Sequence, residues 1–357
     1  MSAIPEGYKQ TEVGVIPEDW DAKTLGDFVF LQRGHDLTDR DRRPGEIPVM
    51  GSAGQNGFHD IALVKGPGVV VGRSGASFGQ AHFCNTNFWP HNTALYVTDF
   101  RGNDRLFAFF FLSSLDFSRH NSGGAQQSLN RNFIAPIPVR IPPLLEQEAI
   151  AQALSDADAL IESLEQLVTK KRYLKRGAMQ DLLTGGKRLP GFGQGWELKR
   201  LGELITLYGE RVDPQLNGVR DFCIELEHIG SSTGALLGST STGENSSLKS
   251  VFRAGDVLFG KLRAYLRKYW RADRAGVCST EIWVLTPREN LIIGAYLFQI
   301  VQTDKFIEVA SYSYGTHMPR SDWNVVKNYE LPIPCDPEEQ IAIAAILSDI
   351  NLPDLSD

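Results

Sequence analysis

The feature of this chain that most limits how it can fold is an internal repeat. The stretch EQEAIAQALSDAD at residues 146–158 returns as EQIAIAAILSDIN at residues 339–351, an offset of 193 positions in a chain of 357 residues. Eight of the paired positions are identical, including Gln147 and Gln340. A repeat on this scale indicates that the chain carries two copies of one structural module.

Further matches flank both copies in the same order. The segment VIPEDWDAKTLGDFV (15–29) resembles GFGQGWELKRLGELI (191–205), and PIPVRIPPLLEQ (136–147) resembles LPIPCDPEEQ (331–340). Between them, VKGPGVVVGRSG (64–75) resembles FRAGDVLFGKLR (252–263), which places Arg73 opposite Lys261, and NTALYV (92–97) resembles STEIWV (279–284). Because the order is preserved, the chain is interpreted as a tandem duplication.

Each module combines strand and helix signals. Short runs of β-branched and aromatic residues bounded by turn residues predict strands, as in GVVVGR, ALYVTDF, DVLFGK and EIWVLTP. Two longer apolar spans without turn residues, 104–117 and 290–309, predict buried helices. Proline-rich segments end each module, because proline cannot continue a strand ladder and readily starts a helix. The expected fold class is therefore α+β, with two tandem modules related by a pseudo-twofold repeat.

A long helix is expected after the first module. From Leu144 to Leu183 there is no proline and Gly177 is the only glycine, and TGG at 184–186 supplies a stop. Forty residues form a rod of roughly 60 Å. Its apolar stripe, which includes Leu154, Ile161, Leu164 and Val168, predicts pairing with another helix as a coiled-coil spacer. A core helix of one globular domain is the alternative interpretation.

Composition restricts the class of protein. The formal net charge of −7 argues against a chain that coats nucleic acid without specificity, although local basic faces remain compatible with it. The four cysteines are far apart and show no CxxC spacing, so reduced thiols in the cytoplasm are expected. No run approaches 18 apolar residues and no secretion signal is visible, so no membrane association is expected.

Motifs for catalysis are weak. GDVLFGKL at 255–262 resembles a phosphate-binding loop, but Leu262 stands where that loop needs a hydroxyl for magnesium. The seven histidines form no HExxH or HxH pair, and no catalytic or metal-binding residues are assigned. We therefore expect a protein that is not an enzyme and holds no cofactor of its own. A stand-alone metal-dependent DNA enzyme built on clustered acids is the alternative.

Nucleic-acid recognition has stronger support, because cations and amides cluster in both modules. Arg and Lys suit phosphate or guanine, and Asn and Gln can contact adenine with two hydrogen bonds. The alternative for any single residue is a solvated basic face. The candidate DNA-binding residues of the first module are Arg33, Arg40, Arg42, Arg43, Gln55, Asn56, Arg73, Ser74, Gln126, Gln127, Asn130 and Arg131. Those of the second are Lys261, Arg263, Tyr265, Arg267, Lys268, His317 and Arg320, with the aromatic residues Tyr269 and Trp270 interleaved.

Taken together, these segments resemble the specificity (S) subunit of type I restriction-modification enzymes over nearly the whole chain. The resemblance rests on the WDAKTLG and WELKRLG module starts, on GDVLFGKLRAYLRK (255–268), on CSTEIWVL (278–285), on LEHI (226–229) and on the doubled EQ…LSD helix start. It implies two target-recognition domains at 1–143 and 191–337, each reading half of a bipartite site in double-stranded DNA. It also implies conserved spacer helices at 144–190 and 338–357.

The resemblance further implies partner subunits. Methyltransferase (M) subunits dock on the helices and restriction (R) subunits join that core. S-adenosylmethionine, ATP and magnesium belong to those partners. Here the second helix departs from the pattern, because Pro353 follows LSDIN closely and a partner for Leu164 is missing. We therefore expect a shortened second helix, an exposed apolar stripe on 157–183 and self-association through it. A truncated or orphan subunit that modulates a sibling complex is a further alternative.

Overall fold

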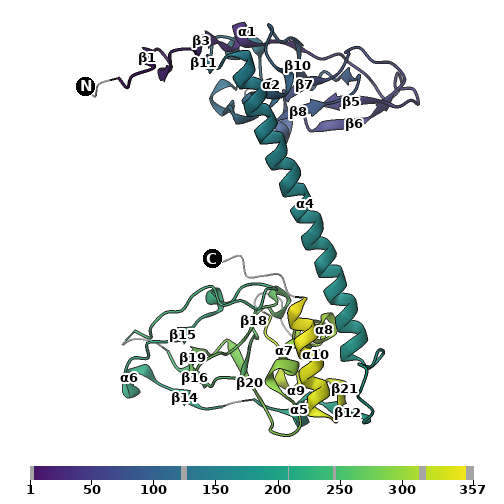
Figure 1. The fold of residues 1–357 in the computed structure, drawn as a ribbon, viewed down its shortest axis with the longest axis vertical. Coiled ribbons are helices and arrows are strands. Elements are labelled where there is room, and N and C mark those ends of the chain that lie inside the picture. Colours follow the sequence, from purple (N-terminus) through teal and green to yellow (C-terminus); the bar gives the residue numbers. More distant parts are fainter. Residues whose placement is uncertain (1–3, 122–126, 208, 244–246, 313–318, 351–357) are drawn as a thin grey trace. The chain divides into compact units, whose positions relative to one another are not determined.

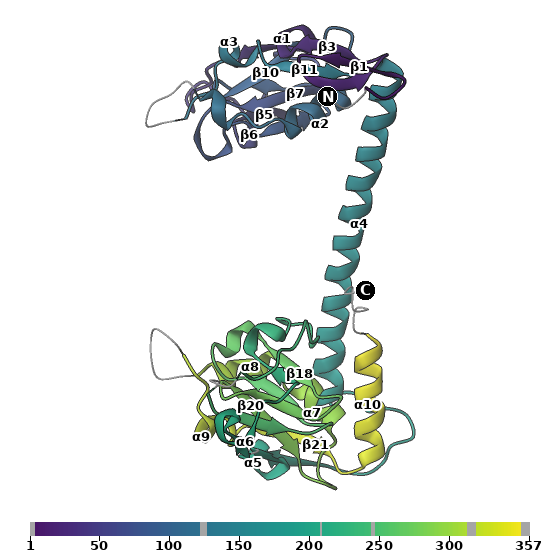
Figure 2. The same ribbon diagram turned by 90° about the vertical axis from the view of Figure 1, so that its left-hand side faces the viewer.

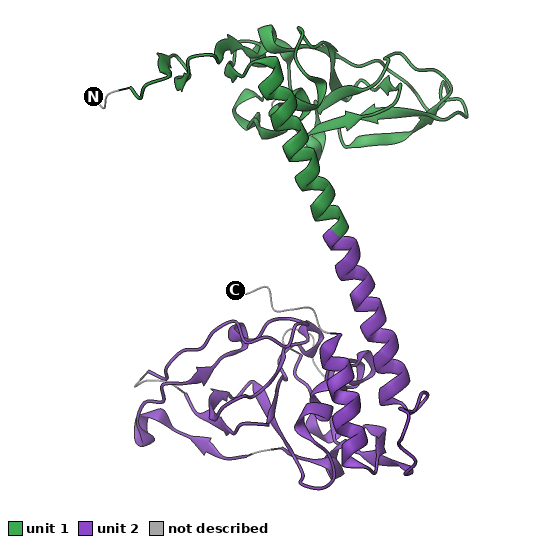
Figure 3. Cartoon of the chain, viewed as in Figure 1, with its two compact units in different colours: residues 1–163 green, residues 164–357 purple. Residues whose placement is uncertain are grey.

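The computed structural model describes residues 4–121, 127–207, 209–243, 247–312 and 319–350. Two compact units divide the chain, residues 1–163 and residues 164–357 (Figure 3). Helix α4 (Leu144–Leu183) contributes to both of them. The 40-residue helix predicted from the sequence is thereby confirmed.

Unit 1 is built on a four-stranded antiparallel sheet with the order β4-β10-β7-β8 (Figure 1). Successive residues of a strand point to opposite faces. Strand β7 therefore buries Val69 and Val71 against the core with helix α2, and Val70 against a second sheet, β6-β5-β9. The bounds are β1 (Tyr8–Thr11), β2 (Gly14–Pro17), β3 (Asp21–Thr24), α1 (Leu25–Phe28), β4 (Phe30–Arg33), β5 (Ile47–Gly51), β6 (Gly54–His59), β7 (Gly68–Gly72), η1 (Gly75–Ser77), β8 (Ala81–Cys84), β9 (Trp89–Pro90), β10 (Ala94–Asp99), α2 (Arg105–Ser114), η2 (Ser118–His120), α3 (Arg131–Ile134) and β11 (Pro138–Ile141).

Unit 2 repeats this plan. Its sheet β13-β20-β17-β18 has the same strand order and direction as β4-β10-β7-β8, and β12 pairs with β21 as β3 pairs with β11. Its second sheet has four strands, β14-β16-β19-β15. The bounds are β12 (Trp196–Arg200), α5 (Leu201–Leu204), β13 (Ile205–Leu207), β14 (Arg211–Val212), α6 (Pro214–Asn217), β15 (Cys223–Ile224), η3 (Leu226–His228), β16 (Lys249–Phe252), β17 (Val257–Gly260), η4 (Ala264–Leu266), β18 (Tyr269–Arg271), β19 (Gly276–Ser279), β20 (Ile282–Pro287), α7 (Gly294–Ile300), α8 (Asp304–Ser311), α9 (Trp323–Val326), β21 (Glu330–Pro334) and α10 (Pro337–Asp349).

The glutamine of the repeated EQ phrase has the same task in both units. The Gln147 side chain accepts a hydrogen bond from the backbone N–H of Asp104, the residue that caps α2, and donates one to the Pro142 carbonyl. The Gln340 side chain accepts from the backbone N–H of Ile293, which caps α7, and donates to the Pro334 carbonyl. Each glutamine thus ties the start of the exit helix to the module that precedes it.

The glutamates of the same phrase have different partners. In unit 1 the Trp20 indole N–H donates to the Glu146 carboxylate over 2.9 Å. In unit 2 Glu339 is fully buried and accepts two bonds from the Arg188 guanidinium, of 2.7 and 2.8 Å. Arg188 also lies over the Trp196 ring, 5.7 Å from its centroid. The repeat therefore preserves the backbone plan while the polar contacts beneath the helix start diverge.

Helix α4 packs against a core near each end. Ile150 and Ala151 contact the unit 1 core, whereas Met179, Leu182 and Leu183 belong to the unit 2 core together with residues of α10. Figure 2 shows α10 beside the last turns of α4. The predicted exposed stripe on 157–183 is therefore wrong for its last third, since these side chains have cores to pack against. Gly185, with φ of +72°, terminates the helix in a conformation that favours glycine.

The predicted single helix over 290–309 is also wrong. Two helices, α7 and α8, occupy this span because the Thr303 side chain caps α8 and accepts from the Phe306 backbone N–H. The four predicted strands in GVVVGR, ALYVTDF, DVLFGK and EIWVLTP are confirmed as β7, β10, β17 and β20.

Candidate nucleic-acid interface

In unit 1, four segments of the chain line one cleft of about 660 Å³. They are the end of β4 with the loop after it, the residue that follows β7, Leu95 of β10, and the residues that precede and open α3. Of the predicted residues, the cleft contains Arg33, Arg73, Asn130 and Arg131. The fold thus gathers a third of the candidates of this module into one concave polar surface.

Backbone hydrogen bonds fix Arg73 in the wall of this cleft. Its N–H donates to the Thr93 carbonyl over 2.9 Å, and its carbonyl accepts from the Leu129 N–H over 2.7 Å. The preceding Gly72 admits no side chain, because a Cβ there would lie 2.0 Å from the Ser77 carbonyl oxygen. The Asn130 side chain caps α3 by accepting from the Asn132 N–H.

The cleft is electropositive. Burial, with the neighbouring charge of Arg33, lowers the pKa of the Arg73 guanidinium, which donates to the Asn92 carbonyl over 3.1 Å. Arg131 lies over the Phe30 ring, 5.3 Å from its centroid. Asp36 is the acid among the lining residues, and the Asn92 amide donates to it. Three guanidinium groups facing one carboxylate make a site suited to an anion.

The other candidates of unit 1 lie outside the cleft. Arg42 donates to the Asn56 carbonyl over 2.8 Å, and Arg43 pairs with Asp60 over 3.0 Å. Gln55 and Asn56 lie on β6 of the hairpin that β5 and β6 form, and Arg42 and Arg43 contact this hairpin and the residue that follows it. Arg40 and Gln55 are exposed. The Ser74 carbonyl accepts from the Ser52 hydroxyl at the tip of that hairpin, so the hairpin adjoins the cleft. Gln127 is exposed, and Gln126 lies outside the described residues.

Unit 2 holds Lys261 in the position that Arg73 has in unit 1. Its N–H donates to the Glu281 carbonyl over 3.0 Å, and its carbonyl accepts from the Ser321 N–H over 2.9 Å. The alignment of Arg73 with Lys261 is thereby confirmed. Arg320 pairs with the Glu281 carboxylate over 2.9 Å, and this hydrogen bond raises the pKa of Arg320.

A strained turn extends this edge of unit 2. Arg263 and Arg267, both at φ of +53°, flank η4, and such a conformation costs a non-glycine residue about 1 kcal/mol or more. The Arg263 N–H donates to the Pro319 carbonyl, and Tyr265 on the turn is 55% exposed. Lys261, Arg263, Tyr265 and Arg320 thus gather at one edge. His317 lies outside the described residues.

Several second-module candidates have structural partners instead. The Lys268 ammonium donates to the carbonyls of Leu226, the first residue of η3, and of Ile229, the residue that follows η3. Arg267 forms an ion pair with Asp304. Tyr269 and Trp270 are buried in two different cores, because both faces of β18 are covered. The interpretation of these two aromatic residues as part of an interleaved binding surface is wrong.

Sequence reasoning missed part of the unit 1 cleft. Gln32 and Asp36 line the cleft beside Arg33. Both are polar residues close to the end of β4, and this position next to Arg33 could have identified them as candidates. Among the described residues, no group of three or more His, Cys, Asp or Glu side chains could hold a metal ion. The described helices also include none that is long and apolar enough to cross a membrane.

Comparison with known proteins agrees with this duplicated architecture. The Type I restriction modification DNA specificity domain matches residues 17–170 and again residues 193–352. The MjaVIII specificity subunit of Methanocaldococcus jannaschii is 21% identical over 97% of this chain and 89% of that protein. The EcoDI specificity subunit of Escherichia coli is 21% identical over 91% of this chain and 80% of that protein.

Solved structures show the same fold. The S subunit of a type I restriction-modification system from M. genitalium gives a TM-score of 0.63 at 16% identity, covering 93% of this chain and 89% of that chain. A chain from a structure that describes complex assembly and conformational transition of the type I R-M system gives a TM-score of 0.51 at 16% identity. The match covers 94% of this chain and 90% of that chain. Two copies of this domain together match most of the sequence. The chain therefore belongs to the family of type I restriction-modification DNA specificity proteins.

Proposed function

We propose that this chain gives a type I restriction-modification complex its DNA sequence specificity, with each unit reading one half of a bipartite duplex site. The observation that carries the proposal is the repeated cation position. Arg73 and Lys261 are held by matching backbone bonds to the residue directly before β10 or β20 and to the segment before α3 or α9. Two equivalent basic edges on one chain suit a target read in two pieces.

The chemistry of the two edges differs, so the two half-sites should differ. Unit 1 offers guanidinium groups from Arg33, Arg73 and Arg131 with the amide of Asn130. Such groups suit phosphate, guanine or adenine, and a good two-bond contact to a base discriminates by about 1–3 kcal/mol. Unit 2 offers Lys261, Arg263 and the exposed Tyr265.

Catalysis is proposed to reside in partner subunits in the cytoplasm. The chain would recognise DNA, and methyltransferase and restriction subunits would supply S-adenosylmethionine, ATP and magnesium chemistry. The docking surface proposed for a methyltransferase is the apolar face of α4. This face includes the half-buried Val168 and the exposed residues Leu154, Leu160, Ile161, Leu164, Leu167 and Leu174.

Self-association is a second use proposed for the same face of α4. Six acidic side chains lie between residues 146 and 165 of the helix, and five basic ones lie between residues 170 and 176. Two copies of α4 in antiparallel contact would place acidic segments against basic ones. Light scattering of the purified chain tests this, and a strict monomer at all concentrations would exclude it.

The test of specificity uses the chain co-expressed with methyltransferase subunits. Methylome sequencing of the host defines the two half-sites. Arg131→Gln should then lower affinity about 5- to 150-fold at one half-site, and Arg263→Gln at the other. The matched controls are Arg140→Gln on β11 and Arg271→Gln on β18, both exposed and both away from the candidate edges. If Arg131→Gln and Arg263→Gln impair the same half-site, the division of labour between the units is wrong.

A further inference from the structure

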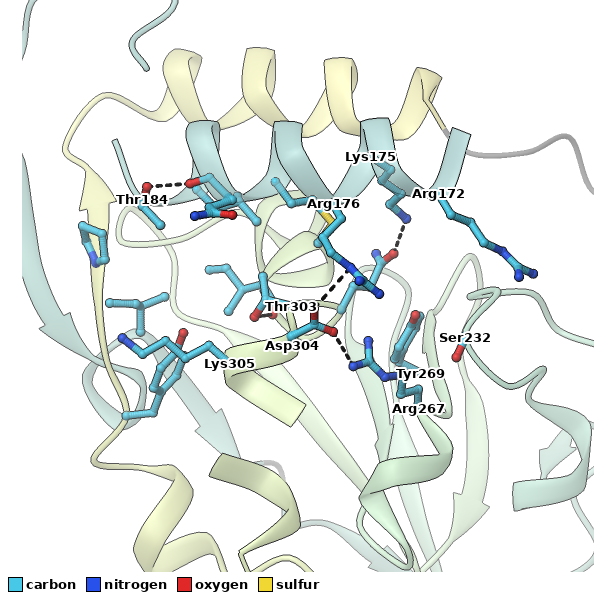
Figure 4. Close-up of a pocket in the computed structure, with 18 of the residues that line it drawn as sticks. Arg172, Lys175, Arg176, Thr184, Ser232, Arg267, Tyr269, Thr303, Asp304 and Lys305 are labelled. Carbon is cyan, nitrogen blue, oxygen red and sulfur yellow. Dashed lines mark hydrogen bonds and ion pairs between the residues drawn. The ribbon is translucent and has the colours of Figure 1, made fainter. Parts of the chain in front are cut away.

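A second, larger cavity of about 940 Å³ lies entirely within unit 2, between the last turns of α4 and the start of α8 (Figure 4). Five cationic and two acidic side chains line it, in a chain whose formal net charge is −7. Three of the cations, Arg172, Lys175 and Arg176, come from α4. None of these three belongs to the candidate interface described above.

Among the described residues that line the cavity, cationic side chains outnumber acidic ones. Arg176 and Arg267 approach the same carboxylate, that of Asp304, so two guanidinium groups share one negative charge (Figure 4). The second acid, Glu330, forms an ion pair with Arg200 over 3.3 Å. An anionic group entering the cavity would therefore meet an excess of cations.

Lys175 supports this interpretation. Its ammonium donates to the neutral amide oxygen of Gln302 over 2.6 Å. Burial lowers the pKa of Lys175 to about 8. An anionic group bound in the cavity would favour the charged form of Lys175.

One short turn connects the wall of the cavity with the candidate interface of unit 2. Arg263 stands at one end of η4 on the interface, and Arg267 stands at the other end in the cavity wall. The Ser232 N–H donates to the Arg267 carbonyl over 2.9 Å, and Ser232 also lines the cavity. A duplex lying along the interface would thus pass its sugar-phosphate backbone close to the cavity.

We propose that this cavity binds a backbone phosphodiester of the DNA duplex and supplies a sequence-independent contact beside the half-site that unit 2 reads. The proposal rests on the DNA-specificity function proposed above. Arginine and lysine contacts to phosphate position a protein on DNA without reading bases. The contact would also couple α4 to the bound duplex, because α4 carries three of the cations.

The test is the salt dependence of binding by the co-expressed complex. Arg172→Gln with Lys305→Gln removes two exposed cations of the cavity. The slope of log K against log salt should become shallower by about 0.9 for each phosphate that the variant no longer neutralises, with unchanged sequence preference. Lys170→Gln is the matched control, because residue 170 lies about 200° around the helix from residue 172.

A chemical scan of the DNA identifies the phosphate. Replacing single backbone phosphates by neutral methylphosphonates should weaken wild-type binding at one position beside the unit 2 half-site. The same replacement should have no effect on the Arg172→Gln/Lys305→Gln complex.

Three outcomes separate this proposal from the one on which it rests. An unchanged salt slope with intact sequence-specific binding overturns the phosphate site alone. A changed base preference in the double variant also overturns it, because the cavity would then read bases. A wild-type complex that shows no sequence-specific binding refutes the proposed function, and the phosphate site with it.

Discussion

Arg188→Met tests how the start of α10 is held on unit 2. The Glu339 carboxylate is 0% exposed and accepts both of its 2.7 and 2.8 Å bonds from Arg188. Removing one partner of a buried ion pair costs about 3–5 kcal/mol. The Arg188 side chain is 35% exposed, so water can reach the vacated position. We therefore place the loss in the free energy of unfolding of unit 2 at about 3 kcal/mol.

Urea denaturation combined with hydrogen exchange measures this loss, because exchange separates the opening of unit 2 from that of unit 1. Peptides from β12, β21 and α10 should lose protection, whereas peptides from unit 1 should keep it. The control is Arg200→Met, whose ion pair with Glu330 is about half exposed on both sides and should contribute about 1 kcal/mol or less.

A double variant makes the test stricter. Arg188→Met with Glu339→Met removes both charges and should recover about 2 kcal/mol, since apolar replacement of a whole buried pair is close to neutral. A single-variant loss below about 1 kcal/mol, or a double variant no more stable than the single one, would refute the reasoning.

The cavity, the glutamine clamps and the face of α4 each lead to a further prediction. Affinity for DNA should fall as pH rises above about 8, because loss of the Lys175 proton removes a cation from the cavity; Lys175→Arg should abolish this part of the pH profile in fluorescence anisotropy. Gln147→Leu should destabilise unit 1 and Gln340→Leu unit 2, each by about 1–3 kcal/mol in hydrogen exchange, because a partly buried backbone N–H loses its acceptor. Leu164→Asp should block co-purification of a methyltransferase subunit while leaving the thermal melting of both units unchanged, since Leu164 is exposed on α4; retained co-purification would contradict the docking face.

The repeat carried most of the fold prediction. Aligning Arg73 with Lys261 identified two backbone positions that the structure holds with equivalent hydrogen bonds. Segments that match in the same order indicate a shared arrangement of strands and backbone hydrogen bonds, and the two units do share that arrangement. The break within 290–309 was missed because the polar residues around Thr303 include no proline or glycine, and only the tertiary turn there makes the Thr303 hydroxyl a helix cap.

The candidate site was harder to predict than the fold. Six cations fall between Lys261 and Arg274, but periodicity cannot tell which of them face solvent. The sequence could not show that Lys268 binds the protein's own backbone, because the two carbonyls that it contacts lie about 40 positions earlier in the chain. Tyr269 and Trp270 could be placed in the core only once both faces of β18 were seen to be covered.

The bonds made by Gln147 and Gln340 have a consequence for protein engineering. Each glutamine clamps the first turn of an exit helix to the module before it, so the direction of that helix is set by the module and not by whatever follows. A chimaera spliced at the proline-rich segment would separate each glutamine from its hydrogen-bond partners. A splice placed two turns into the helix would transfer the module, its glutamine and the first turns of the helix together. New target specificities could then be assembled by exchanging such segments.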